Sequence, residues 1–140
     1  MSRVYVIGSL RNPDVPRVAD ALRSTTTTVF DDWHAAGPDA DTCWREYEQA
    51  RGITYRDALR GPVANNNFNF DKKWLDWADT GVLVLPCGKS GHLELGYLAG
   101  RGARTFVYMP EEPTEGWDLM YKLANDVVFD IDTLRERVEG

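Results

Sequence analysis

The chain has 140 residues, of which 43% are hydrophobic and 27% are charged, and its formal net charge is −6 at neutral pH. This length and composition predict one ordinary globular domain over residues 1–140. The acidic balance argues against a nucleic acid polymer as partner, because binding such a polyanion depends on clustered lysine and arginine. A single small phosphorylated ligand remains compatible with this net charge. No apolar run approaches the ~20 residues that span a bilayer, so we expect no membrane partner.

The cysteines and histidines are few. Cys43 and Cys87 are too few for a disulfide framework or a cysteine-based zinc site. No charged-then-apolar leader precedes the first predicted strand, so we expect a reducing, cytoplasmic location. His34 and His92 are isolated and form no metal-binding motif, and we therefore expect no metal and no cofactor.

The first half of the chain alternates strand and helix patterns. Residues 3–8 predict a strand that ends at Gly8, followed by a helix with Asn12 as N-cap and Pro13 at its first position. Residues 26–30 predict a second strand. One or two exposed helices are expected over 39–59, ended by Gly61 and Pro62, then a loop at 65–67 and a helix over 69–78.

The second half continues the alternation. Residues 81–86, 105–109 and 126–129 predict strands, and 92–100, 116–124 and 130–138 predict helices. Parallel strands need crossover connections, so the fold class is an α/β, flavodoxin-like or Rossmann-like, doubly wound five-stranded parallel sheet in the order 2-1-3-4-5. Ligands bind such sheets where the winding reverses, which brings the loops at 8–12 and 87–91 together.

Glu94 is the leading candidate nucleophile. With Ser90 as N-cap, Glu94 falls near the start of a helix, where the helix dipole favours an ionised carboxylate. A fixed carboxylate of this kind can attack a substrate. The alternative is that glutamate is common in first turns for the same electrostatic reason.

A second carboxylate would suit glycosidic cleavage, because one acid attacks while the other manages a proton. Asp71, Asp76 and Asp79 are the candidates, and sequence spacing does not choose among them. Asp79 directly precedes the strand at 81–86, where a turn acid is the alternative reading.

Other residues of these loops favour an anionic or planar ligand. Ser9 and Arg11 lie in a glycine-containing loop, and arginine beside a helix N-terminus binds carboxylate or phosphate well. Trp33 and His34 follow the second strand and are placed to stack on a planar base. Cys87 is a possible nucleophile, although a buried cysteine at a strand end is commoner.

Three segments, VYVIGSLRN, WADTGVLVLP and SGHLELGYLAGRGARTFVYM, resemble the nucleoside 2-deoxyribosyltransferase family, including its relatives that hydrolyse 2'-deoxynucleoside 5'-monophosphates. The resemblance implies that Glu94 attacks C1' of the sugar and forms a glycosyl-enzyme, with Asp79 handling the proton of the leaving base. It implies that Tyr5 or Ser9 lies at the sugar end, and that the segment at Asn125 reaches the site of a neighbouring subunit. A homo-oligomer, a dimer or larger, is therefore expected.

The loop before Glu94 departs from the transferases, because Gly88 stands where they place another acid. Ser90 and the GSLRN loop are closer to the monophosphate hydrolases, whose loops hold the 5'-phosphate. The first hypothesis is transfer of a deoxyribosyl group between bases; the alternatives are hydrolysis of (deoxy)nucleoside 5'-monophosphates and a non-catalytic nucleotide-binding module. In each case the partner is a small nucleoside or nucleotide, and the predicted binding residues are Tyr5, Gly8, Ser9, Arg11, Trp33, Gly88, Ser90 and Asn125.

Overall fold

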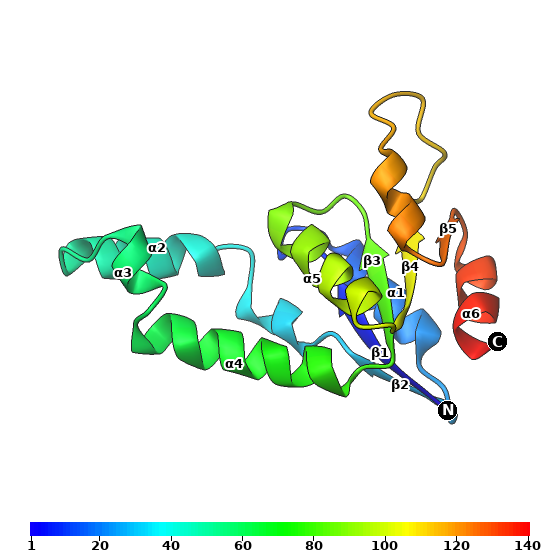
Figure 1. The fold of residues 1–140 in the computed structure, drawn as a ribbon, viewed down its shortest axis with the longest axis horizontal. Coiled ribbons are helices and arrows are strands. Elements are labelled where there is room, and N and C mark those ends of the chain that lie inside the picture. Colours follow the sequence, from blue (N-terminus) through cyan, green and yellow to red (C-terminus); the bar gives the residue numbers. More distant parts are fainter.

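The computed structural model describes residues 1–140 and contains one five-stranded sheet in the order β2-β1-β3-β4-β5 (Figure 1). Every neighbouring pair of strands is parallel, which confirms the predicted fold class and strand order. The strands are β1 (Ser2–Ile7), β2 (Thr27–Phe30), β3 (Thr80–Val84), β4 (Arg104–Tyr108) and β5 (Asp126–Val128).

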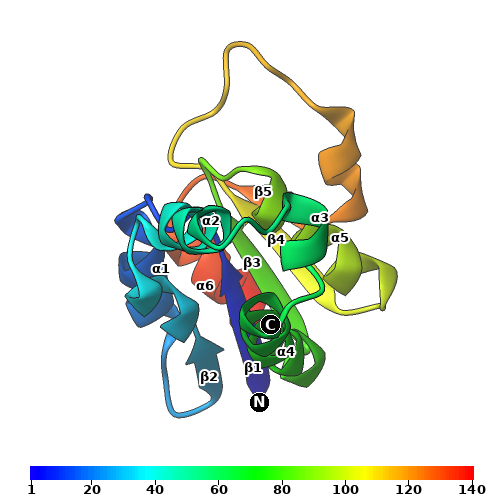
Figure 2. The ribbon, with the colours of Figure 1, turned by 90° about the vertical axis from the view of Figure 1, so that its left-hand side faces the viewer.

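Helices cover both faces of the sheet (Figure 2). Helices α1 (Asp14–Leu22) and α6 (Ile131–Glu139) pack on one face, against strand residues such as Val4 and Val82. Helices α4 (Pro62–Trp77) and α5 (Lys89–Gly100) pack on the other, against residues such as Ile7 and Leu83. Successive strand side chains point to opposite faces, so residues 4–7 of β1 and 81–84 of β3 carry no charge and are buried, because both faces of the sheet are covered there.

A helical arm projects away from the sheet and consists of α2 (Ala40–Ala50), α3 (Tyr55–Ala58) and the first turns of α4 (Figure 1). The predicted loop at 65–67 is wrong, because these three asparagines lie inside α4. Gly61 is the N-cap of α4 and Pro62 its first residue, where a proline is tolerated because the first amide needs no partner in the helix. The Gly-Pro pair therefore begins a helix here.

Smaller differences concern helix ends and the last connection. Helix α1 begins at Asp14, one residue later than predicted, and the Asn12 side chain accepts a hydrogen bond from the Asp14 amide at 3.0 Å. The helix predicted over 116–124 is a short 3₁₀ helix, η2 (Leu119–Leu123), and another, η1 (Asp32–Ala36), follows β2. None of the helices has the length and apolar character that crossing a bilayer requires.

Candidate functional site

A cavity of about 610 Å³ lies at the carboxyl ends of β1 and β3, where the winding of the sheet reverses. Its walls come from four segments: the end of β1 with the following loop, η1 with the start of α2, the middle of α4, and the loop before α5 with the first turns of that helix. The structure brings together eight of the predicted site residues, namely Tyr5, Gly8, Ser9, Arg11, Trp33, Gly88, Ser90 and Glu94.

Glu94 lies in the second turn of α5, because the helix begins at Lys89 with Gly88 as its N-cap. The prediction that Ser90 caps this helix is therefore wrong, and Glu94 is outside the first turn. Burial in the cavity wall raises the pKa of Glu94 to about 7, opposite to the shift that a helix N-terminus would produce. Near neutral pH this carboxyl group can therefore exist in both its protonated and its ionised form.

Tyr5 supports Glu94 from the sheet. Its side chain on β1 is 1% exposed, and its ring packs against Phe30 with centroids 5.3 Å apart. A hydrogen bond between the Tyr5 hydroxyl and Glu94 lowers the pKa of Glu94 and so favours its carboxylate, although burial outweighs this effect. Burial and the charge of Glu94 raise the pKa of Tyr5 itself, so the phenol stays protonated and acts as a donor.

Asp71 supplies the second carboxyl group of the cavity, from the middle of α4. It is partly buried, and this burial raises its pKa. The negative charge of Asp71 also raises the pKa of Glu94, which indicates that the two acids lie within electrostatic reach across the cavity. The structure therefore places Asp71, of the three candidates, with Glu94.

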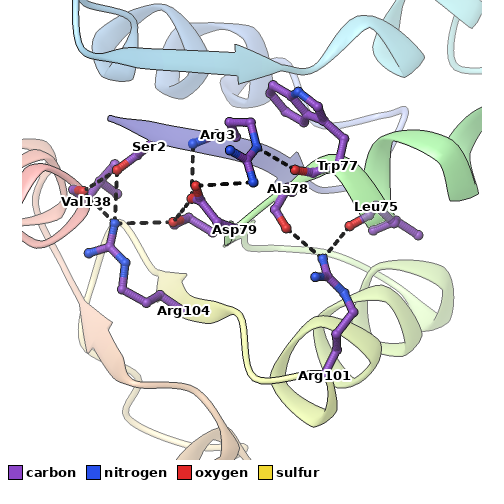
Figure 3. A network of polar contacts seen from close by, with 10 residues as sticks. Ser2, Arg3, Leu75, Trp77, Ala78, Asp79, Arg101, Arg104 and Val138 are labelled. Carbon is purple, nitrogen blue, oxygen red and sulfur yellow. Dashed lines mark hydrogen bonds and ion pairs between the residues drawn. The ribbon is translucent and has the colours of Figure 1, made fainter.

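Asp79 lies at the opposite, amino end of β3 and does not line the Glu94 cavity (Figure 3). Its Oδ1 accepts hydrogen bonds from the Arg3 amide at 3.0 Å and from the Thr80 hydroxyl at 2.8 Å. Asp79 thus ties the starts of β1 and β3 together. Asp76 is also outside the cavity, where it is paired with Lys72 at 2.6 Å on the surface of α4.

Asn125 does not reach the Glu94 cavity of its own chain. Its Oδ1 accepts a hydrogen bond from the Thr105 amide at 2.9 Å, which attaches the start of β5 to β4. Asn125 lines a separate cavity of about 920 Å³, bounded by Leu85, the segment 109–124 and β5. Its predicted role in substrate binding has no support within the single chain.

Two basic side chains reach the Glu94 cavity from the loop after β1 and from the start of α5. Arg11 and Lys89 line it together with the hydroxyl-bearing Ser9 and Ser90. The Ser9 hydroxyl accepts a hydrogen bond from the Arg11 amide at 3.1 Å, which orders the loop after β1. The first amides of α5 have no partners within that helix, and Gly88 provides no side-chain cap, so these groups can donate to an anion in the same place.

Gly8 and Trp33 have structural roles in the floor of the cavity. A Cβ atom on Gly8 would lie 2.5 Å from Cγ2 of Val15, so the close packing of α1 on the sheet requires glycine here. The Trp33 indole donates a hydrogen bond to the Val6 carbonyl at 2.8 Å, which fixes its orientation beneath the cavity. His34 instead contacts the Asn12 carbonyl at 3.1 Å and does not line the cavity.

Sequence analysis did not identify four further residues of the cavity wall. Asn67 and Phe70 line the cavity from α4, and Asp32 and Asp41 line it from η1 and α2. A helix recognised from Pro62 onward would have placed Asn67 on the same side as Asp71, one turn apart. No group of three or more His, Cys, Asp or Glu side chains is arranged to hold a metal ion.

Cys87 also lines the cavity, but its environment favours the unreactive thiol. Burial raises the pKa of Cys87, and the charge of Glu94 acts in the same direction. Helix α5 packs closely over this cysteine, because a Cβ on Gly91 would lie 2.2 Å from its Sγ. Cys87 is therefore a packing residue of the loop.

No protein-family model matches the chain, and no curated protein matches it in sequence. Solved structures match its fold. A 2-deoxyribosyltransferase from the psychrotolerant bacterium Bacillus psychrosaccharolyticus superposes with a TM-score of 0.62 at 17% identity, over 96% of this chain and 90% of the other. The CMP N-glycosidase BcmB of Clostridium botulinum superposes with a TM-score of 0.52 at 10% identity, over 99% of each chain. The chain therefore shares its α/β fold, along nearly its whole length, with these two enzymes.

Proposed function

We propose that this protein cleaves the N-glycosidic bond of a 2'-deoxynucleoside or its 5'-monophosphate, with Glu94 as the nucleophile. The observation that carries the proposal is the cavity at the winding reversal, in which Glu94 lies with Tyr5 and a second acid, Asp71. The two enzymes of like fold are named as a 2-deoxyribosyltransferase and a CMP N-glycosidase, which supports the same class of bond. The resemblance of the GHLELGYLAG segment to that family points to the same glutamate.

In the first step, the ionised Glu94 carboxylate attacks C1' of the sugar. The bond between C1' and the base nitrogen breaks, its electron pair leaves with the base, and the base takes a proton from Asp71. A raised pKa keeps Asp71 protonated closer to neutral pH, which is what a general acid requires. Tyr5, whose hydrogen bond favours the ionised form of Glu94, is the positioning residue.

In the second step, an acceptor attacks C1' and the ester bond to Glu94 breaks, which regenerates the carboxylate. The proton of the acceptor passes to Asp71. A second base as acceptor gives deoxyribosyl transfer, and water gives hydrolysis. The basic side chains of Arg11 and Lys89 favour the second candidate, a 5'-monophosphate hydrolase, because a nucleoside has no charge for these residues to bind.

The test of the nucleophile uses Glu94→Gln, with Glu136→Gln on the exposed surface of α6 as the matched control. Each protein is incubated with a deoxynucleoside, its monophosphate and a free acceptor base, and the products are separated by chromatography. We expect Glu94→Gln to lose base release and base exchange, and the control to retain both. Release at the wild-type rate by Glu94→Gln would refute the mechanism, and tight binding of unchanged ligand by the wild type would indicate a nucleotide-binding module.

The test of the acid compares Asp71→Asn with Asp76→Asn, five residues further along the same helix and outside the cavity. General acid catalysis contributes about 10²–10⁴-fold, so Asp71→Asn should lose roughly this factor in kcat. The loss should shrink for a substrate whose leaving group needs no proton, such as a nitrophenyl deoxyriboside. An equal loss for both substrates would contradict the assignment of Asp71 as the acid.

A further inference from the structure

Helix α4 presents one polar and aromatic face to the cavity. Asn67, Phe70 and Asp71 all line it, and their spacing of three and four residues puts them on the same side of the helix. The Phe70 side chain is 50% exposed although it belongs to a cavity wall. Its ring meets Phe30 edge-on with centroids 5.9 Å apart, so the sheet supports it from behind. An aromatic ring held in this way and open toward a cavity is suited to stack on a planar ligand.

We propose that this face of α4 is the base subsite, with Phe70 as its stacking platform, and that it selects bases carrying an exocyclic amino group. The inference rests on the proposed function, because Asp71 must lie beside the leaving base to give it a proton. Phe70 directly precedes Asp71 in the chain. A base that receives a proton from Asp71 therefore lies within reach of the Phe70 ring.

The charges of the cavity give the substrate its direction. The basic side chains of Arg11 and Lys89 attract the 5'-phosphate. The base is attached to C1' of the sugar and the phosphate to the oxygen on C5'. A phosphate bound by Arg11 and Lys89 therefore directs the base toward another wall of the cavity. Glu94 must face C1', which lies between the bound phosphate and the bound base. The α4 face is then the wall that the base meets.

The preference for an amino group follows from the other carboxylates of the cavity. Asp32 from η1 and Asp41 from α2 line it with their acidic side chains. An ionised carboxylate only accepts hydrogen bonds, so it binds the amino group of cytosine or adenine and repels the carbonyl oxygen at the same position of uracil or hypoxanthine. The Asn67 amide both donates and accepts, so it does not discriminate alone.

The experiment measures base release from two matched pairs, dCMP with dUMP and dAMP with dIMP, whose members differ in one amino group. We expect kcat/KM to be about tenfold or more higher for the amino member of a pair, in line with one well-placed hydrogen bond. Replacing both acids by Asp32→Asn and Asp41→Asn should bring this ratio close to one, because an amide can also donate to a carbonyl. Phe70→Ala should lower kcat/KM for every substrate about tenfold or more, whereas Phe68→Ala, an exposed phenylalanine outside the cavity, should not.

The outcomes separate the two proposals. Release of both members with no amino preference refutes the base preference while the proposed function stands. Equal effects of Phe70→Ala and Phe68→Ala refute the stacking platform. If no member is cleaved, the proposed function fails, and equilibrium binding of the same four nucleotides to Glu94→Gln then decides the base preference independently.

Discussion

Replacing Glu94 by glutamine should stabilise the folded protein at alkaline pH. Burial raises the pKa of Glu94 from its ordinary value of 4.5 to about 7. Between these two values the folded state keeps a proton that the unfolded state has already lost. The free energy of unfolding therefore falls as the pH rises through this window, and it levels off above the folded pKa.

The size of the effect follows from the shift. One pKa unit corresponds to about 1.4 kcal/mol, so ionising Glu94 in the folded protein costs about 3 kcal/mol above neutral pH. Glutamine has a similar shape and never ionises. The stability advantage of Glu94→Gln over the wild type should grow by about 2.5 kcal/mol from about pH 5 to about pH 8, or about 8 °C in Tm for a domain of this size.

The assay is urea unfolding at several pH values across this range, followed by tryptophan fluorescence, for the wild type and Glu94→Gln. The control is Glu136→Gln, which removes a glutamate from the exposed surface of α6 and should change stability little at any pH. If the free energy of unfolding changes with pH in the same way for the wild type and Glu94→Gln, the claim that burial of this carboxyl destabilises the fold is refuted. The variant that lacks this buried acid is thus expected to be the more stable protein.

Three further predictions concern residues around the cavity and at the far end of the sheet. Tyr5→Phe removes a hydrogen bond that favours the Glu94 carboxylate, so the acidic limb of the pH profile of kcat/KM should move to higher pH. Gly8→Ala forces a Cβ to within 2.5 Å of Val15 and should lower the free energy of unfolding by about 1–3 kcal/mol in denaturant titrations, and Val15→Ala in the same chain should remove the clash. Asp79→Asn should lower Tm while leaving kcat unchanged, since this residue joins two strands far from the cavity, and a loss of kcat with unchanged Tm would contradict that role.

Much of the fold could be predicted from sequence because its signals are local. Strands buried on both faces contain continuous apolar runs, as in residues 4–7 of β1 and 82–84 of β3, and alternation with helices implies parallel pairing. The loops at the winding reversal followed from that order alone. The three asparagines at 65–67 misled the prediction because they favour turns, whereas the proline that begins α4 and the packing of its later turns on the sheet outweigh that preference.

Asp71 could be identified as the second acid of the cavity only from the direction in which α4 runs relative to the sheet. A crossover helix runs antiparallel to the strands that it connects, so its early turns lie near their carboxyl ends and its last residues near their amino ends. Asp71 therefore lies at the site, whereas Asp79, eight residues later, lies at the opposite end of the sheet. Figure 3 shows Asp79 there beside Arg3 at the start of β1. The electrostatics of Glu94 could not be predicted, because its burial depends on side chains from α4 and β1 that are distant in sequence. The expected homo-oligomer and the role of Asn125 across subunits stay predictions.

Every residue that lines the Glu94 cavity precedes Leu95 in the chain, although the sheet is completed only by β4 and β5. During synthesis all groups of the cavity therefore emerge before β4, which pairs with the far edge of β3, and before β5, which pairs with β4. At typical translation rates β3 would wait for β4 on the order of seconds, as an apolar strand with one unpaired edge. The unpaired edge of β3 is thus open to aggregation while the chain is incomplete, and substitutions in β4 should influence yield in the cell more than ligand binding in the cavity.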